Sequence, residues 1–557
     1  MHNVSKCNKN CDEVSKTKNS KYQVRLPLLL AVAVVAGIFI GATISESGPA
    51  STHALNNFYK FREVLSYIQR EYVDEVDTDE LVESAIEGML EDLDPHTVYI
   101  KAKDRELTNA QLEGEFEGIG IEFNIFKDTL YVVAPLSGGP SEKAGIQTGD
   151  KIIKVDGKDF AGVGISFRDV YDNLRGKKGS EVILTIQRKK ESELLEFSII
   201  RDKIPQYSVD AAYMVDDEIG YIKVSRFSIT TYDEFRTSIK QLKGEGMNKL
   251  IIDLQGNPGG IMGSAVNMVD ELLSGEALIV FTKGNGGQYD NKMYANPKNK
   301  GLFEDKPIIV LIDEGSASAS EIVAGALQDN DRALIVGRRS FGKGLVQSPI
   351  QLSDGSELRL TISRYYTPSG RSIQKPYDSG TEETYSADLI NRYNHGEFFN
   401  VDSIKFNDSL KFETIKGRPV YGGGGIMPDF FVPYDTTMNS NYLRQLFIKS
   451  VIREYALKYY EENQESLKSM SFKEYNGNFS VDQDMLSELK ALAISSGIEY
   501  SEEEFNTSRF LIETHLKAQI ARSVWNGEGF FPIYNQTNEV FMNALKLFDK
   551  ASSLIES

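Results

Sequence analysis

The chain has 557 residues, of which 41% are hydrophobic and 26% are charged, and this is an ordinary globular composition. Its formal net charge is −19, and because an acidic surface repels phosphate backbones, the composition argues against nucleic-acid binding. At about 150 residues per domain, the length predicts three or four domains.

The N-terminal segment has the composition of a membrane anchor. Residues 1–25 are rich in lysine and precede Leu26–Ile44, an uncharged stretch long enough, at about 1.5 Å per residue, to cross a bilayer as a helix. The basic flank predicts a single-pass anchor in the inner or cell membrane, with the rest of the chain on the extracytoplasmic, periplasmic side. A cleaved signal peptide is the alternative, although the stretch is longer than a usual signal core. Both cysteines, Cys7 and Cys11, precede the stretch, so Cys-based catalysis outside the membrane is excluded.

The next segments differ in their periodicity. Residues 55–113 read as a helical N-terminal region, whose second helical run ends at Asp94-Pro95. Residues 114–201 change to short β-rich runs separated by glycine turns, which predict a small β domain. Residues 436–557 return to a helical pattern and predict a C-terminal helical domain.

Residues 202–435 alternate strand-like with helix-like segments, which is the order of an α/β fold. Helices are expected near Tyr232–Lys243 and from Ala319 to Gln328, and residues 378–412 read as an irregular insertion. Buried strands are expected at Gly220–Val224, Leu250–Leu254, Pro307–Ile312 and Leu334–Gly337.

Three serines follow the third of these strands at the start of a predicted helix. Small residues between Asp313 and Glu321 expose a hydroxyl where the helix N-terminal amides can stabilise an oxyanion. The alternative is that Ser316, Ser318 and Ser320 only cap the helix, since serine is favoured there. The segment by itself does not choose among the three serines.

A serine nucleophile requires a base, and the chain offers few histidines. Among the five, only His395 lies in the α/β region, so a Ser-His-Asp triad has little support, although histidines can be recruited spatially. Lysine acts as a base when burial lowers its pKa, and Lys343 is flanked by glycines and apolar residues. Gly337–Lys343 also fits the first seven positions of a P-loop, but Gly344 replaces the Mg²⁺-binding Ser/Thr, which argues against nucleotide binding.

Two glycine-containing loops are candidate binding elements. Gly259 and Gly260 follow a buried strand and can aim amides at a substrate, although a tight turn without a ligand is equally compatible. A glycine-apolar loop before the first β run can hold a peptide's terminal carboxylate while the peptide adds a strand to the sheet edge. This second loop consists of Gly118, Ile119, Gly120 and Ile121.

Together these segments resemble the carboxy-terminal processing peptidases, or tail-specific proteases, which are PDZ-containing Ser/Lys serine peptidases. The resemblance covers about residues 55–435 and implies an α/β peptidase core of the crotonase/ClpP-like type with an inserted PDZ domain. The helical N-terminal region and the helical C-terminal extension flank that core. The motifs that carry the resemblance, beside the PDZ segments, are Leu93–Thr97, Asp253–Gly260, Gly315–Glu321, Phe341–Gly344 with Gln347, and Gly417–Asp429.

The resemblance implies a role for each matched residue. Ser318 is the nucleophile and Lys343 is the general base, while Gln347, expected one helical turn further on, orients the lysine amine. The amide of Ala319 and that of Gly259 or Gly260 form the oxyanion hole. Arg175 matches a position that links PDZ ligand binding to the active site, and its alternative is a solvated surface arginine. Gln255 stands where relatives commonly carry arginine, so a local ion pair is expected to be missing.

The expected function is therefore cleavage of proteins whose flexible C-terminal tails bind the PDZ domain, with no metal or other cofactor. A catalytically silent PDZ scaffold that delivers partners to another protease is one alternative, and an acyl-CoA enzyme of the crotonase type is another. Self-association into a homo-oligomer and the roles of residues 378–412 and 436–557 are left open.

Overall fold

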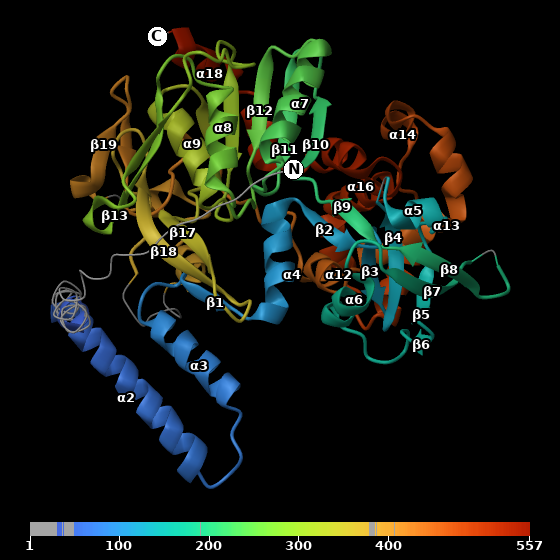
Figure 1. Ribbon diagram of the computed structural model, residues 1–557. Helices are drawn as coiled ribbons and strands as arrows, with labels where there is room; N and C mark the ends of the chain where they lie inside the picture. The colour runs from blue at the N-terminus through green and yellow to red at the C-terminus, as the bar shows by residue number, and fades with distance from the viewer. Residues whose placement is uncertain are drawn as a thin grey trace, which may run out of the picture. The chain divides into compact units, whose positions relative to one another are not determined.

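The computed structural model describes residues 31–35, 37, 49–136, 138–189, 191–377, 385, 387–405 and 407–556 (Figure 1). The chain divides into two compact units, of which the first ends at Ile86 and the second begins at Glu87. Most of the expected anchor, Leu26–Ile44, lies outside the described residues. Within the described part, no helix is both long and apolar enough to span a bilayer.

The region 55–113 is helical with one exception. Its helices are α2 (Pro49–Glu71), α3 (Thr78–Glu91) and α4 (Ala102–Glu113). Between α3 and α4, where only helix was expected, β1 (Val98–Ile100) pairs with β18 (Glu357–Tyr366) in the second unit. A three-residue strand carries too little period-2 signal to be predicted, and its conformation is set by its distant partner.

The small β domain is a sheet ordered β3-β4-β5-β7-β8, with β6 paired to β5. Alternate residues such as Leu130, Val132 and Ile152 are fully buried and form its core. β3 lies at the edge of this sheet, beside no other strand than β4 among the described residues. The elements are β3 (Ile121–Phe126), β4 (Thr129–Pro135), α5 (Pro140–Ala144), β5 (Lys151–Val155), β6 (Lys158–Asp159), α6 (Phe167–Leu174), β7 (Glu181–Gln187) and β8 (Leu195–Ile200).

A two-stranded ribbon joins the small β domain to the α/β core. Its strands, β2 (Glu115–Gly118) and β9 (Asp202–Pro205), are antiparallel and lie at the two ends of the domain's sequence. The domain is therefore an insertion whose entry and exit strands are hydrogen-bonded to each other.

The core is a six-stranded sheet ordered β10-β11-β12-β15-β16-β21, parallel from β11 onward. All four expected buried strands and both expected helices are present within one or two residues of their predicted ends. The strands are β10 (Val209–Met214), β11 (Ile219–Val224), β12 (Lys249–Asp253), β15 (Ile308–Ile312), β16 (Leu334–Gly337) and β21 (Phe430–Phe431).

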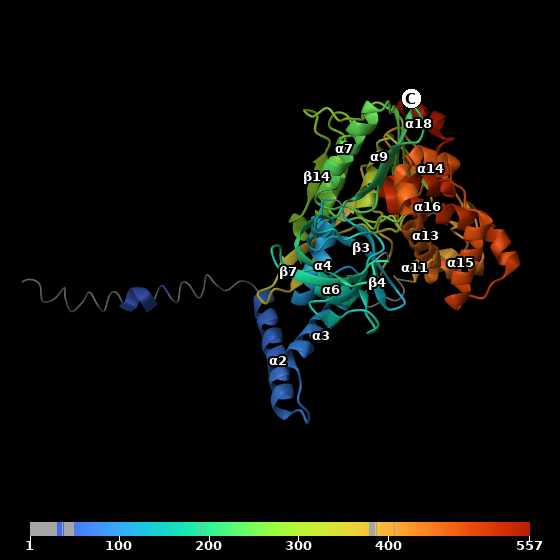
Figure 2. The ribbon, with the colours of Figure 1, turned by 90° about the vertical axis from the view of Figure 1, so that its right-hand side faces the viewer.

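Helices cover both faces of this sheet, because its strands carry apolar side chains on both. Ile222 and Ile252 face α7 (Thr231–Gly244), α8 (Met262–Asp270) and α9 (Ala319–Asp329). Tyr221 and Ile251 point the other way and pack against the last two helices of the chain. Figure 2 shows the end of the chain to the right of α7 and α9. These last two helices are α17 (Glu539–Ala544) and α18 (Phe548–Glu556), so the end of the chain completes the core.

A second sheet contains the strand that begins two residues after Lys343. Its order is β1-β18-β13-β14, with β17 (Leu345–Gln351) paired to β18. β13 is Leu278–Gly284, β14 is Asn291–Tyr294, and a short 3-10 turn, η1 (Asn285–Gly287), separates them. Within the insertion, the described elements are α11 (Asp388–Asn394), η2 (Val401–Ser403), η3 (Asp408–Leu410) and β19 (Lys411–Glu413), which pairs with β20 (Pro419–Tyr421).

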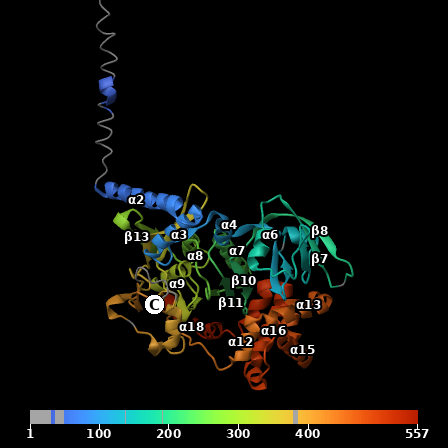
Figure 3. The ribbon, with the colours of Figure 1, turned by 90° about the horizontal axis from the view of Figure 1, so that it is seen from below.

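The C-terminal helices form a separate hydrophobic core that includes Tyr442, Leu446 and Leu516. They lie beside the small β domain (Figure 3), to which Arg522 connects them through an ion pair with Glu122 at 2.9 Å. These helices are α12 (Asn441–Ile448), α13 (Val451–Ser469), α14 (Phe472–Asn478), α15 (Gln483–Ser495) and α16 (Glu502–Tyr534).

Candidate active site

Ser318 occupies a strained position between β15 and α9. Its φ is 54° and its ψ is −112°, outside the conformations that non-glycine residues normally adopt. The turn sits at the carboxyl end of the parallel sheet and at the amino end of a helix whose eleven residues are all buried. The helix dipole therefore favours negative charge next to the Ser318 side chain.

Glu321 connects the serine turn to the lysine loop. Its side chain is fully buried, and one oxygen accepts hydrogen bonds from Ser318 N at 2.8 Å and Lys343 N at 2.9 Å. The other oxygen accepts from Ser340 Oγ at 2.6 Å and Gly342 N at 2.7 Å. Burial raises the pKa of Glu321 to about 7, but four donors and no acceptor fit an ionised carboxylate. The sequence signal for this role was the serine–x–x–glutamate spacing of a capping box.

Tyr365, on β18, makes a second connection between the same two segments. Its buried hydroxyl lies 3.0 Å from the carbonyl oxygen of Ser318 and 2.6 Å from that of Lys343. Both carbonyls accept from one phenol. The two segments are thus joined through their amides by Glu321 and through their carbonyls by Tyr365. Sequence reasoning did not identify Tyr365, because no local pattern marks a residue that acts from another sheet.

Lys343 is half-buried, as the apolar and glycine-rich flanks predicted. Burial lowers its pKa below the ordinary value of 10.5, while the negative charges of Asp94 and Glu321 act in the opposite direction and Arg359 adds to the lowering. Its Nζ and Ser318 Oγ are not hydrogen-bonded to each other; within the described residues, Lys343 bonds only through its backbone. Catalytic hydrogen bonds are often formed only when substrate is bound.

The predicted helical spacing between Lys343 and Gln347 is wrong. Residues 345–351 form β17 and pair with β18, because Gly342 and Gly344 flank the lysine in an irregular loop that leads into the strand. The Gln347 side chain instead reaches across the ladder, where its Nε2 lies 3.3 Å from Thr361 Oγ1. Gln347 is therefore oriented by its cross-strand neighbour.

The loop after β12 lies directly against the serine turn. A Cβ placed on Gly259 would lie 2.7 Å from Ser318 Cβ, and this glycine has a φ of 95°. The Gly259 amide donates to Asn257 Oδ1 at 2.8 Å. The amides of Gly260 and Ala319 donate to no group in the described part of the chain, which leaves these two available to an oxyanion.

Comparisons with known proteins agree with this geometry. The chain is 39% identical over 349 residues to a carboxy-terminal-processing protease of Bartonella bacilliformis, a match that covers 61% of this chain and 79% of the relative. It is 33% identical to a probable CtpA-like serine protease of Staphylococcus aureus, covering 69% of this chain and 75% of the relative. The carboxy-terminal processing protease CtpB of Bacillus subtilis is 32% identical, with 68% and 78% covered.

The chain belongs to the carboxy-terminal processing protease family. Models of peptidase family S41 and of a PDZ domain match residues 218–386 and 118–199. The N-terminal domain of the activating protease CtpB matches residues 40–104, and a family of unknown function matches 442–526. The chain is thus a PDZ-containing serine-type peptidase of the α/β fold that the sequence predicted, and the scaffold and acyl-CoA alternatives are not supported.

The loop that carries Gln255 receives a cation from the neighbouring strand of the peptidase core. Lys223, from the neighbouring strand β11, lies 3.1 Å from Asp253 Oδ1 and 2.6 Å from the carbonyl oxygen of Gln255. Gln255 is uncharged and forms no ion pair within the described residues, so the pair that an arginine there would make is absent. The cation beside Asp253 comes from another segment of the chain, because parallel pairing brings β11 beside β12.

The loop predicted to bind a peptide carboxylate, Gly118–Ile121, leads into the edge strand β3 of the PDZ domain. Ile119 and Ile121 are buried in the domain core, Gly120 has a φ of 74°, and Gly118 forms an isolated bridge with Arg175. β3 pairs with no strand other than β4 among the described residues, and such a sheet edge next to a glycine loop suits a peptide that adds one more strand. Protein or peptide substrates with free C-termini fit this domain.

Arg175 is half-buried, so it is not a solvated surface arginine. Its guanidinium carbon lies 4.5 Å from the ring centre of Phe116 and 4.6 Å from that of Tyr171. Burial lowers its pKa, and its Nε and Nη1 have no hydrogen-bond partner among the described residues. A planar cation held between two rings with free donors fits a carboxylate.

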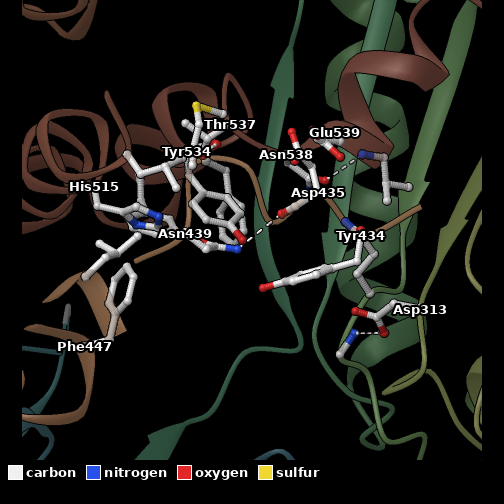
Figure 4. A pocket seen from close by; sticks show the side chains of 18 of the residues that line it. Asp313, Tyr434, Asp435, Asn439, Phe447, His515, Tyr534, Thr537, Asn538 and Glu539 are labelled. Atoms are coloured by element: carbon white, nitrogen blue, oxygen red, sulfur yellow. Dashed lines mark hydrogen bonds between the residues drawn. The ribbon is translucent and has the colours of Figure 1, made fainter. Parts of the chain in front are cut away.

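A cavity of about 950 Å³ separates the end of the core sheet from the C-terminal helices (Figure 4). Asp313 and Tyr434 line one side, and Phe447 and His515 line the other. Neither Ser318 nor Lys343 lines it, so this cavity is not the catalytic site. Burial lowers the pKa of His515 from 6.5 to about 4.

Proposed function

We propose that this peptidase cleaves protein substrates through a Ser318 acyl-enzyme, with Lys343 as general base. The observation that carries the proposal is that Glu321 and Tyr365 tie the Ser318 turn to the Lys343 loop. A shared carboxylate and a shared phenol keep the two segments in one geometry while the side chains are free to meet. Such preorganisation is what nucleophilic catalysis requires.

The reaction begins when neutral Lys343 removes the proton of Ser318 Oγ. The oxygen attacks the carbonyl carbon of the scissile bond, and the resulting oxyanion accepts hydrogen bonds from the free amides of Ala319 and Gly260. The lysine ammonium then gives its proton to the leaving amine as the carbon–nitrogen bond breaks. Water then attacks the ester carbonyl while the same lysine removes its proton. The lysine gives this proton to Ser318 Oγ as the acyl–oxygen bond breaks, so that both side chains return to their starting states.

Gln347 and the PDZ domain supply orientation. The amide oxygen of Gln347 accepts a hydrogen bond from the Lys343 amine, which leaves the nitrogen lone pair for the serine proton. The substrate's C-terminal residues bind beside β3, with the terminal carboxylate at the loop Gly118–Ile121 and near Arg175. Binding of the tail raises the local concentration of the scissile segment at Ser318.

The test uses purified protein and fluorescently labelled casein as an unstructured substrate. Ser318→Ala and Lys343→Ala are expected to fold and to lose activity by at least about 1,000-fold, since the nucleophile and its base act as a unit. Lys343→Arg is expected to be equally inactive, because arginine does not give up its proton. Undiminished turnover by any of the three variants, with normal unfolding curves, would contradict the assignment of Ser318 as nucleophile and Lys343 as base.

We also propose that Leu26–Ile44 anchors the peptidase in the membrane, with the catalytic part on the extracytoplasmic side. The support is the apolar stretch and its basic flank. Protease accessibility of intact cells or spheroplasts tests the orientation, and alkaline extraction tests the anchor. Release of the protein by alkaline carbonate contradicts anchoring. Self-association stays a prediction, which sedimentation of the purified chain checks.

A further inference from the structure

The segment Asp94–Thr97 lies in the second unit and is fastened to the strand that carries Tyr365. Asp94 is 8% exposed, and its Oδ1 accepts from the amides of His96 at 2.9 Å and Thr97 at 3.1 Å. Its Oδ2 accepts from Thr97 Oγ1 at 2.6 Å. The turn after α3 is therefore closed on a buried carboxylate, and β1 continues from it into the ladder with β18.

Thr361 on β18 completes this contact. Its amide donates to Thr97 Oγ1 at 3.1 Å, and its hydroxyl lies 3.0 Å from Asp94 Oδ1. An ionised carboxylate only accepts, so the single hydroxyl proton of Thr361 points to Asp94. Toward any other neighbour, Thr361 Oγ1 is an acceptor.

That other neighbour is Gln347, which lies directly opposite Thr361 in the β17–β18 ladder. Since Thr361 Oγ1 accepts, the Gln347 atom 3.3 Å away is the amide nitrogen, as its Nε2 placement has it. Orientation of the Gln347 amide is thus set by Asp94 through one hydroxyl. The Gln347 oxygen is left to accept a hydrogen bond from another donor.

The amine of Lys343 is such a donor, and the charge of Asp94 acts on it. The Asp94 carboxylate is the charge that most favours the Lys343 ammonium. The other charged or titratable groups that act on or are affected by this amine are His96 from the same turn, Glu321 from α9 and Arg359 from β18.

We propose that Asp94 and Thr361 are positioning residues, which hold the Gln347 amide so that its oxygen binds the Lys343 amine and directs the lone pair to Ser318. The inference rests on the proposed function, but it assigns a role to a segment that lies more than 200 residues before the catalytic residues in sequence. It gives a role to the buried carboxylate in the turn before β1, because without this acceptor the Thr361 proton has no fixed direction.

The experiment compares Thr361→Val, which keeps the shape and removes the hydroxyl, with Thr361→Ser, which keeps the hydroxyl. We measure kcat/KM on labelled casein from pH 6 to 10, together with the thermal midpoint. Thr361→Val is expected to lower the plateau by about 10-fold, a part of the roughly 10²–10⁴-fold that a positioned general base contributes. Its acidic limb is expected to move to lower pH, because the ammonium loses an acceptor. Thr361→Ser is expected to stay within about 2-fold of the parent.

Thr414→Val is the matched control. The Thr414 hydroxyl also donates to a buried aspartate, Asp331 Oδ1, at 3.0 Å, and it accepts from the amide of Arg418 at 3.0 Å. This variant is expected to lose a similar amount of stability with an unchanged pH profile. A general structural defect would move the thermal midpoint in both variants and the acidic limb in neither.

A double-mutant cycle tests whether Thr361 acts through Gln347 or independently of it. If Thr361 acts only through Gln347, Thr361→Val costs nothing further in a Gln347→Ala background. The inference is overturned if Thr361→Val keeps the parent kcat/KM and pH profile, if Thr361→Ser is as poor as Thr361→Val, or if the two losses multiply. If any of these results is found while Ser318→Ala is inactive, only the positioning role is overturned. If Ser318→Ala is active, the proposed function itself is overturned.

Discussion

The carboxylate of Glu321 accepts a hydrogen bond from the backbone amide of Lys343 at 2.9 Å, in a fully buried setting. The same oxygen accepts from the amide of Ser318 at 2.8 Å. One buried side chain therefore binds both segments, and together with Tyr365 it fixes the distance between the serine turn and the lysine loop.

Glu321→Gln is expected to disturb both stability and turnover. The new NH₂ group faces two donors in place of an acceptor, and leaving buried donors unsatisfied costs about 1–3 kcal/mol each. Urea denaturation measures the loss, and casein cleavage measures the change in kcat. Glu245→Gln, at the exposed end of α7, serves as the control and is expected to change neither quantity. Parent-like stability and turnover in Glu321→Gln would show that the carboxylate does not hold the two segments.

Gly259→Ala is expected to abolish activity by moving the serine turn. The added Cβ would lie 2.6 Å from Ala317 O and 2.7 Å from Ser318 Cβ, at a backbone φ of 95°. The strain and the clash predict a loss of about 2 kcal/mol or more in unfolding free energy. Gly263→Ala, in the helix α8 with nothing within 4 Å of the new Cβ, is expected to be neutral or stabilising by up to about 1 kcal/mol. Equal effects of the two alanines contradict this account.

Arg175→Gln is expected to weaken the binding of peptide tails to the PDZ domain by about 10-fold, or about 1.4 kcal/mol. The guanidinium lies between Phe116 and Tyr171 with two nitrogens that lack partners in the described chain, so a tail carboxylate can pair with it. Fluorescence polarisation with an apolar labelled peptide measures the affinity. The loss should be confined to the free acid and absent for the same peptide with an amidated C-terminus. Arg168→Gln, on the exposed face of α6, is the control.

The stability of the peptidase is expected to fall as the pH drops from 6.5 to 4. Burial lowers the pKa of His515 from 6.5 to about 4, so the folded protein keeps the imidazole neutral while the unfolded chain takes up a proton. This contribution is present above pH 6.5 and is lost on acidification, by at most about 3 kcal/mol. His96, whose pKa burial also lowers to about 4, acts with the same sign.

His515→Phe isolates the contribution of His515, because an aromatic ring keeps the packing against Phe447 and Tyr534. The difference between the thermal midpoints at pH 7 and pH 5 is expected to shrink in this variant. A difference equal to that of the parent would mean that His515 is protonated in the folded state.

Local sequence patterns were sufficient for much of the fold. The strands β11, β12, β15 and β16 and the helices α7 and α9 lie where apolar periodicity and turn residues predicted them. The glycine flanks of Lys343 correctly indicated burial, since small residues let neighbouring segments close over the lysine stem. These features depend on interactions between residues close together in the chain. The choice of Ser318 among three serines came from the family resemblance. The chain's relatives confirm the family.

Only the tertiary structure decided which distant groups meet at this site. Pairing of β17 with β18 placed Gln347 opposite Thr361 and replaced the helical spacing that had been expected. Parallel pairing of β11 with β12 brought Lys223 to Asp253, so that an ion pair forms beside the uncharged Gln255. Strand register and sheet order are set by packing across the whole core, so a sequence window read by itself carries no record of which side chains become neighbours.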